Sequence, residues 1–158
     1  MLSLLGAAPF KDLTAGELQL EVKRAWTVVA NPQLLLELRA GKGGDRGVLQ
    51  VSRMSTASLQ TITDNEDLGA VAAKFGESMT ARGKNWGKSA GSKKGPSALG
   101  RMGMSSFVGG QYPSIVAWFT VTRRAAYMWT WLGPDPQGSE VDDMVKLVMT
   151  AKELPAKK

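Results

Sequence analysis

Histidine and cysteine are both absent from this 158-residue sequence, and the two absences restrict its chemistry. Without cysteine the chain can form no disulfide, thiolate metal site or cysteine nucleophile. Without histidine it lacks the usual general base near neutral pH and the commonest metal ligand. A Ser-His-Asp triad is therefore excluded. An enzyme built from this chain would depend on carboxylates, lysine, tyrosine or a bound cofactor.

Long hydrophobic runs are missing as well. No stretch approaches the roughly 20 apolar residues that a membrane-spanning helix requires. The opening residues 1–10 are apolar, but no basic residue precedes them and the run is too short for a secretory signal. These features predict a cytoplasmic protein with no membrane span.

The length and composition are those of one ordinary domain. Hydrophobic residues make up 43% of the chain and charged residues 22%, which provides enough apolar side chain for a packed core. We expect a single α+β domain over residues 1–158, with a flexible basic loop at about residues 83–97 and a frayed C-terminal tail.

Alternation of apolar and polar residues predicts the first strands. Leu18, Leu20 and Val22 alternate with polar neighbours, which is the period of a half-buried strand. Two further β-favouring segments follow at residues 34–38 and 48–52, separated by a glycine-rich turn. Short connections between the three segments predict an antiparallel meander.

Strands return in the second half of the chain. Residues 97–107 are irregular but compatible with a strand. Residues 114–122 are apolar on both faces, which predicts a central strand covered on both sides. Residues 125–132 return beside it after a hairpin turn at Arg123 and Arg124.

Helical spacing of apolar residues predicts two helices, at about residues 66–82 and 140–152. The element order is then βββ-α-βββ-α. Strands joined as hairpins, rather than alternating with helices, indicate an α+β fold with an antiparallel sheet of about six strands flanked by two main helices.

This order resembles the PsbP-like fold family, whose members include a photosystem extrinsic subunit, a Ran-binding nuclear import factor and certain bacterial secretion-effector chaperones. The resemblance is carried by the run from Leu18 to Val28, the segments Ala117-Trp118-Phe119 and Tyr127-Met128-Trp129, and the closing helix. It covers nearly the whole chain. It implies a protein that binds other proteins rather than a catalyst.

The stretch at residues 83–103, GKNWGKSAGSKKGPSALGRMG, contains Gly87-Lys88-Ser89, which looks like the end of a phosphate-binding loop. Such a loop needs four residues between its glycines and lies between a strand and a helix. Here Gly83 precedes Gly87 by three intervening residues, and Gly91 and Gly95-Pro96 prevent an orderly helix downstream. A nucleotide-triphosphate loop is therefore excluded.

The distribution of charge is the strongest functional signal. The net charge is +6, yet no Asp or Glu occurs from Ser78 to Pro134, where eight residues are basic. Such a segment can be a solvated connector, a contact surface for an acidic protein, or a nucleic-acid site with Trp86 as a stacking platform. The candidate partner-binding residues are Arg82, Lys84, Trp86, Lys88, Lys93, Lys94 and Arg101.

Two other groups of residues have a structural and a functional interpretation. Cross-strand packing explains the aromatic set Trp118, Tyr127, Trp129 and Trp131, with an exposed binding face as the alternative. Met102 and Met104 either fill gaps in the core or line a binding surface. The acids Glu140, Asp142 and Asp143 lie in the first turn of a helix, where negative charge is favoured for electrostatic reasons alone.

No catalytic residue, cofactor or metal site is predicted. We expect a non-enzymatic binding module, a bacterial accessory or chaperone-like protein that binds another protein. Its candidate contact surfaces are the basic segment and the aromatic face of the sheet. Binding of nucleic acid or another polyanion through the basic glycine- and lysine-rich segment is the alternative.

Overall fold

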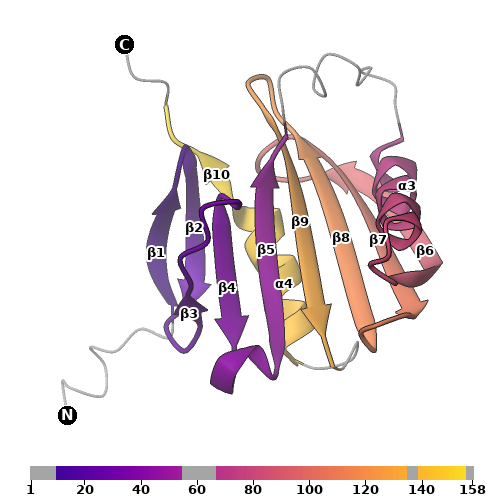
Figure 1. Ribbon diagram of the computed structural model, residues 1–158. Coiled ribbons are helices and arrows are strands. Elements are labelled where there is room, and N and C mark those ends of the chain that lie inside the picture. The colour runs from indigo at the N-terminus through magenta and orange to yellow at the C-terminus, as the bar shows by residue number, and fades with distance from the viewer. Residues whose placement is uncertain (1–9, 55–66, 135–138, 156–158) are drawn as a thin grey trace.

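The computed structural model describes residues 10–54, 67–134 and 139–155 (Figure 1). Its two α-helices are α3 (Leu68–Ala81) and α4 (Ser139–Thr150), and a short 3-10 turn, η1 (Lys42–Gly44), follows the fourth strand. The strands are β1 (Phe10–Ala15), β2 (Leu18–Lys23), β3 (Thr27–Val28), β4 (Leu36–Ala40), β5 (Gly47–Arg53), β6 (Gly87–Pro96), β7 (Arg101–Gly109), β8 (Ser114–Val121), β9 (Ala126–Gly133) and β10 (Lys152–Glu153).

The strands form two antiparallel sheets. The larger has seven strands in the order β3-β4-β5-β9-β8-β7-β6, and the smaller has the order β1-β2-β10. The predicted α+β class, antiparallel pairing and two helices are confirmed. The strand number and order differ from the prediction, because β2 leaves the expected meander. The chain turns after Lys23, where the Trp26 amide donates to the Lys23 carbonyl, and β2 pairs with β1 instead.

Strand β8 has the two covered faces that its sequence predicted. Ile115, Ala117 and Phe119 pack with α3 residues on one side of the sheet. Val116 and Trp118 pack with α4 residues and with the small sheet on the other. Figure 1 shows α3 in front of the large sheet and α4 behind it. The two hydrophobic cores therefore lie on opposite faces of one sheet.

Helix α3 approaches the sheet closely because glycines face each other at the contact. The Asp67 carboxylate caps the helix by accepting the amide hydrogens of Gly69 and Ala70. A Cβ atom added to Gly103 of β7 would lie 1.9 Å from the carbonyl carbon of Leu68. Further along the helix, Gly76 makes room for the ring of Phe107. These contacts determine which strands α3 covers, namely β6, β7 and β8.

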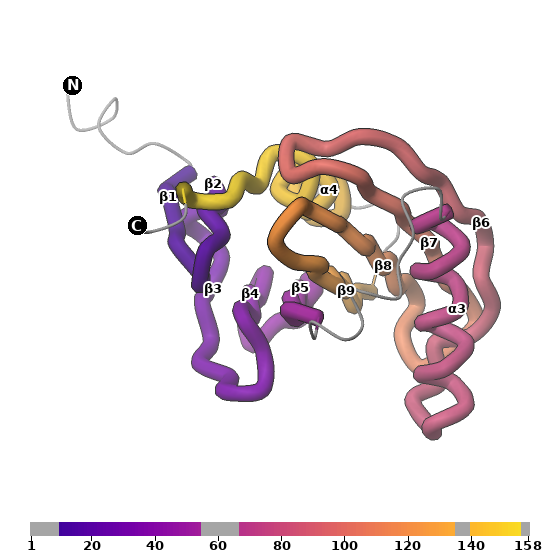
Figure 2. The backbone as a smooth tube through the Cα atoms, turned by 90° about the horizontal axis from the view of Figure 1, so that it is seen from above, coloured from indigo at the N-terminus to yellow at the C-terminus, as the bar shows by residue number. Residues whose placement is uncertain are grey.

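The loop predicted at about residues 83–97 is wrong for most of its length, because residues Gly87–Pro96 form β6. Its backbone pairs with β7 over nine residue pairs, with a bulge between Ser89 and Gly91. The β6–β7 hairpin curves over the sheet edge so that its tip meets α4 (Figure 2), where the Ala98 amide donates to the Met149 carbonyl over 3.1 Å. Backbone pairing with β7, rather than side-chain pattern, makes this segment a strand.

Two predicted features, the apolar opening stretch and the frayed tail, lie mostly outside the described residues. Residues 1–9, which carry most of the apolar opening stretch, and residues 156–158 of the expected frayed tail lie outside the described residues. Among the residues that are described, none of the helices is long and apolar enough to cross a membrane.

Candidate functional site

The basic segment forms the outer strand of the seven-stranded sheet. In the β6–β7 register, Lys88 is opposite Val108, Lys93 is opposite Met104, and Lys94 is opposite Gly103. Directly opposite residues of an antiparallel pair share a face of the sheet. Lys94 therefore lies on the α3 face, while Lys88 and Lys93 lie on the other. The three exposed lysines flank the sheet edge on both sides, and we call them the edge lysines.

The edge lysines form no ion pair with any acid that the structure describes. The ion pairs between described residues involve other cations, including Lys23, Arg39 and Arg53. The nearby segment of the chain contributes no carboxylate, because Asp and Glu are absent between Ser78 and Pro134. The edge of the sheet therefore presents positive charge to solvent.

The other predicted contact residues do not join the edge lysines in one patch. Arg82 ends α3 as its C-cap residue and is exposed. Arg101 begins β7 opposite Pro96 and is half-buried. Lys84 precedes β6 and lines a hollow beneath α3. The seven candidates are therefore distributed over at least three places.

Trp86 is in the core and not on the basic surface. Its side chain is only 5% exposed and packs edge-on against Phe75, with ring centres 5.5 Å apart, and against Phe107 at 5.2 Å. Its amide donates to the Thr80 hydroxyl over 3.1 Å. A stacking platform for nucleic-acid bases requires an accessible ring face, so this part of the nucleic-acid hypothesis is wrong.

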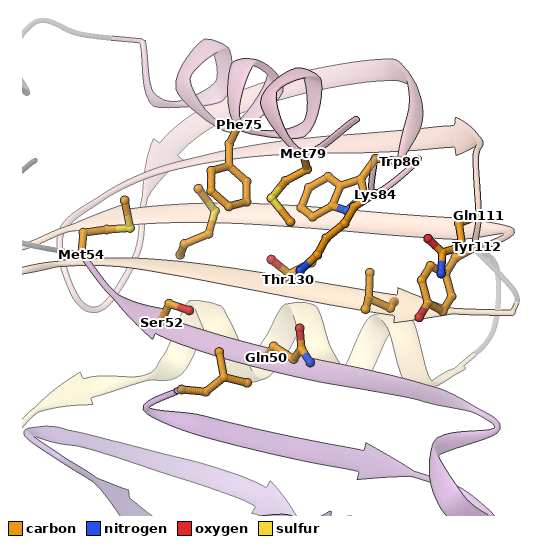
Figure 3. Close-up of a pocket in the computed structure, with 13 residues that line it drawn as sticks. Gln50, Ser52, Met54, Phe75, Met79, Lys84, Trp86, Gln111, Tyr112 and Thr130 are labelled. Atoms are coloured by element: carbon orange, nitrogen blue, oxygen red, sulfur yellow. The ribbon is translucent and has the colours of Figure 1, made fainter. Parts of the chain in front are cut away.

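A cavity of about 450 Å³ lies between α3 and the neighbouring strands β5 and β9 (Figure 3), and we call it the trough. It exists because α3 covers β6 to β8 and leaves β5 and β9 open on that face. Apolar side chains form much of its wall: Met54, Phe75, Met79, Trp86 and Met128.

Several polar groups face the trough without a partner among the described residues. Ser52, Lys84, Gln111 and Thr130 line it, and their side chains make no hydrogen bond with any residue that the structure describes. Figure 3 shows the Lys84 side chain extending across the trough toward Thr130. Lys84 is the one charged residue among the described residues of the lining. The trough is therefore an apolar cavity with one cation and several uncharged polar groups.

Gln50 is the exception, because its amide nitrogen is held by Glu37 on the adjacent strand β4. The Glu37 carboxylate is 3% exposed and accepts from Gln50 over 3.0 Å, from Arg39 over 3.0 Å and from Asn31 over 3.4 Å. Burial opposes ionisation of Glu37, but these hydrogen bonds outweigh it and lower its pKa. Glu37 is therefore a satisfied carboxylate that fixes Gln50 at the trough.

Comparison with known proteins gives structural likeness without sequence likeness. No protein-family model matches the chain, and no curated protein sequence does. The solution structure of cyanobacterial PsbP (CyanoP) from Synechocystis sp. PCC 6803 superposes with a TM-score of 0.66 at 13% identity, over 94% of this chain and 95% of that one. The protein has the PsbP-like fold. The Saccharomyces cerevisiae Ran-binding protein Mog1p is also similar, with a TM-score of 0.53 at 10% identity over 94% of this chain and 86% of that one.

Two of the segments that carried the resemblance in sequence, those in β8 and β9, lie in the interior of the seven-stranded sheet. Trp118 of β8 is opposite Trp129 of β9 in the register, and α4 covers that face. Trp118, Tyr127, Trp129 and Trp131 are all buried. The packing interpretation of the aromatic set is confirmed, and the aromatic face as an exposed contact surface is wrong. Met102 and Met104 are partly buried against the same core.

The acids at the start of α4 connect that helix to the small sheet. Glu140 accepts the indole hydrogen of Trp26 over 2.8 Å, and Asp143 is 2.5 Å from the ammonium nitrogen of Lys23. Among the described residues, no group of three potential acidic or nitrogen ligands is placed to hold a metal ion. Glu140 and Asp143 therefore have a structural role through their contacts with Trp26 and Lys23.

Sequence reasoning missed a polar cluster where the two sheets meet. The Tyr127 hydroxyl of β9 donates to Glu17 over 2.5 Å and lies 3.1 Å from Glu153 of β10. Arg53 donates to the same Glu17 oxygen over 2.7 Å. The members come from residues 17, 53, 127 and 153, so no local pattern could have predicted their contact. The cluster joins the small PsbP-like sheet to the large one.

Proposed function

We propose that this protein is a non-enzymatic, protein-binding accessory or chaperone-like module whose partner presents an acidic surface. The observation that carries the proposal is the row of edge lysines on β6, exposed and without acidic partners among the described residues. Clustered positive charge on one edge attracts a negatively charged partner and orients it during the encounter.

The geometry of β6 favours side-chain docking over addition of a strand. An outer strand has free backbone groups that can pair with an extended peptide. Lysines and bulges on an outer strand work against such pairing, and β6 has both, the bulge lying between Ser89 and Gly91. We therefore propose that acidic side chains of the partner contact the edge lysines directly.

The structural neighbours are consistent with this proposal but do not establish it. Mog1p is described as Ran-binding, and that description belongs to Mog1p. A shared fold does not determine function, and sequence identity of 10–13% transfers no site residues. Protein binding by this chain therefore depends on the edge lysines and not on the likeness.

Charge reversal of the edge lysines is expected to weaken partner binding. The variant Lys88→Glu, Lys93→Glu, Lys94→Glu should lower affinity by at least about tenfold, because three attractive charges become repulsive. The measurement is affinity capture from the native host with wild-type and variant protein, followed by titration of the captured partner. The matched control is Lys42→Glu, Lys74→Glu, Lys152→Glu, which reverses three exposed lysines elsewhere and leaves the net charge equal to that of the first variant.

Retention of the same partners by both variants would refute the proposal. A nucleic acid as the captured partner would support the alternative instead. In that case the logarithm of the affinity for single-stranded DNA should fall linearly and steeply with the logarithm of salt concentration, and the edge-lysine variant should reduce the slope.

A further inference from the structure

The trough has the dimensions and lining of a small-molecule site. Its volume of about 450 Å³ is within the range of roughly 300–1,000 Å³ typical of ligand pockets. Such pockets combine apolar walls with a few polar groups that orient the ligand. Three methionines line the trough, Met54, Met79 and Met128. Their flexible side chains can adjust to an apolar body of variable shape.

The charge of the lining determines the charge of the ligand. Among the described residues of the wall, Lys84 is the single charged side chain and none is a carboxylate. Glu37, the acid that contacts Gln50 of the lining, already pairs with Arg39 at 2.9 Å. The ammonium group of Lys84 therefore remains available for an anion. Thr130 and Gln111 add donors that have no partner among the described residues.

We propose that the trough binds an amphipathic carboxylate, a small molecule with an elongated apolar body and one carboxylate group. The carboxylate pairs with Lys84 and accepts from Thr130 or Gln111. The apolar body lies along Phe75, Met79, Trp86 and Met128. The carbonyl oxygen of Gln50, whose nitrogen is occupied by Glu37, disfavours a second negative group at the opposite wall.

This site is separate from the edge lysines and is tested independently of them. Lys88 and Lys93 lie on the face of the sheet opposite to α3, whereas the trough is on the α3 face. Lys94 is on the α3 face, but it is not among the described residues that line the trough. Reversal of the edge lysines should therefore leave carboxylate binding unchanged. Loss of one activity does not imply loss of the other.

The test is calorimetric titration of the full chain with decanoate, below the concentration at which it forms micelles, and in parallel with decanol. Decanoate should bind to one site, and decanol more weakly. Lys84→Met should lower decanoate affinity by at least about tenfold and leave decanol affinity unchanged, because a hydrogen-bonded charge pair is lost. The matched control is Lys88→Met, which removes an exposed lysine from the opposite face and should change neither affinity.

A variant that fills the trough provides a second measurement. Met79→Trp should remove binding of both decanoate and decanol, while circular dichroism shows the fold retained. Equal affinity of decanoate for the wild type and Lys84→Met would overturn the carboxylate assignment. Absence of decanoate binding, or binding that Met79→Trp does not affect, would overturn the site. Binding of an acidic peptide in the trough, lost in Met79→Trp and without any binding of decanoate to one site, would assign the trough to a peptide instead.

Discussion

Replacing Gly103 with alanine is expected to lower the free energy of unfolding by about 2–3 kcal/mol, because the added methyl group has no space. The new Cβ atom would lie 1.9 Å from the carbonyl carbon of Leu68 and 2.1 Å from the amide nitrogen of Gly69. Both atoms belong to the backbone of the first turn of α3, so rotation of a side chain cannot relieve the overlap. Thermal unfolding followed by circular dichroism should show a midpoint lowered by roughly 5–10 °C.

The matched control is Gly95→Ala, on the other strand of the same hairpin. Nothing lies within 4 Å of a Cβ atom added there, and Gly95 has no left-handed backbone conformation. This change should be neutral or stabilising by a few tenths of a kcal/mol, because alanine restricts the unfolded chain. Equal midpoints for the two variants would show that α3 does not pack against β7 as closely as described.

The same substitution connects stability to the proposed ligand site. Phe75 and Met79 of α3 form one wall of the trough. A helix displaced from β7 would change the shape of that wall, so Gly103→Ala should also weaken decanoate binding. The carboxylate proposal and the packing of α3 can thus be examined with one variant.

The central strands could be predicted because their side chains alternate between two cores. Residues of β8 point in turn toward α3 and toward α4, and both faces are apolar. Helix α4 has a clear apolar stripe formed by Met144, Leu147 and Val148, all buried. Where burial follows the period of the backbone, the sequence contains the information needed to recognise the element.

Strand β6 could not be predicted in the same way because it carries no such period. Its residues are mostly exposed on both faces, since it has a neighbour on one side only and α3 covers only part of it. The same reasoning explains β10, whose two residues pair with Gln19 and Leu18 at the far end of the chain. Pairing of this kind depends on tertiary context, which local pattern does not contain.

The binding surfaces were predicted only in part, for a related reason. The edge lysines are a cluster in the sequence and all lie on one strand, so composition identified them. The trough takes residues from Leu34 to Leu132, on separate strands, a helix and connecting segments. Trp86, a candidate contact residue in the sequence, is buried in the core and forms part of the trough wall. Only the folded arrangement shows that cavity.

Removal of the Tyr127 hydroxyl is expected to cost about 1.5–3 kcal/mol of unfolding free energy at neutral pH, because a buried hydrogen bond to a charged group is lost. Tyr127 is fully buried, and its hydroxyl joins Glu17 to the position of Glu153 at the boundary between the sheets. The variant is Tyr127→Phe, measured by urea unfolding across a series of pH values. The loss of unfolding free energy in this variant should change with pH, because Glu17 and Tyr127 ionise in different pH ranges.

Glu17 determines how the unfolding free energy changes at acidic pH. Burial opposes its ionisation, but hydrogen bonds from Tyr127 and Arg53 outweigh burial and lower its pKa from 4.5 to about 2. A carboxylate with a lowered pKa in the folded state stabilises the protein fully above its ordinary pKa. That contribution, worth about 3 kcal/mol, is lost as pH falls from about 4.5 toward 2.

Tyr127 itself determines how the unfolding free energy changes at alkaline pH. Burial, followed by the hydrogen bond to Glu17, raises the pKa of the phenol above its ordinary value of 10.0. Its neutral form therefore stabilises the protein fully below that pH, and the contribution is lost as pH rises beyond it. In Tyr127→Phe the alkaline loss should disappear. The acid loss should decrease but remain, because Arg53 still donates to Glu17.

The control is Tyr112→Phe. Tyr112 is 36% exposed, and its hydroxyl makes no hydrogen bond with the described residues. The unfolding free energy of this control should match the wild type from acid to neutral pH, so the difference between the two variants isolates the cluster. If Tyr127→Phe instead lowered stability equally at pH values below 2, near 7 and above 10, the lost hydroxyl would be acting through packing alone. The two sheets would then be joined by their apolar contacts, and the charges of Glu17 and Arg53 would contribute nothing measurable to that boundary.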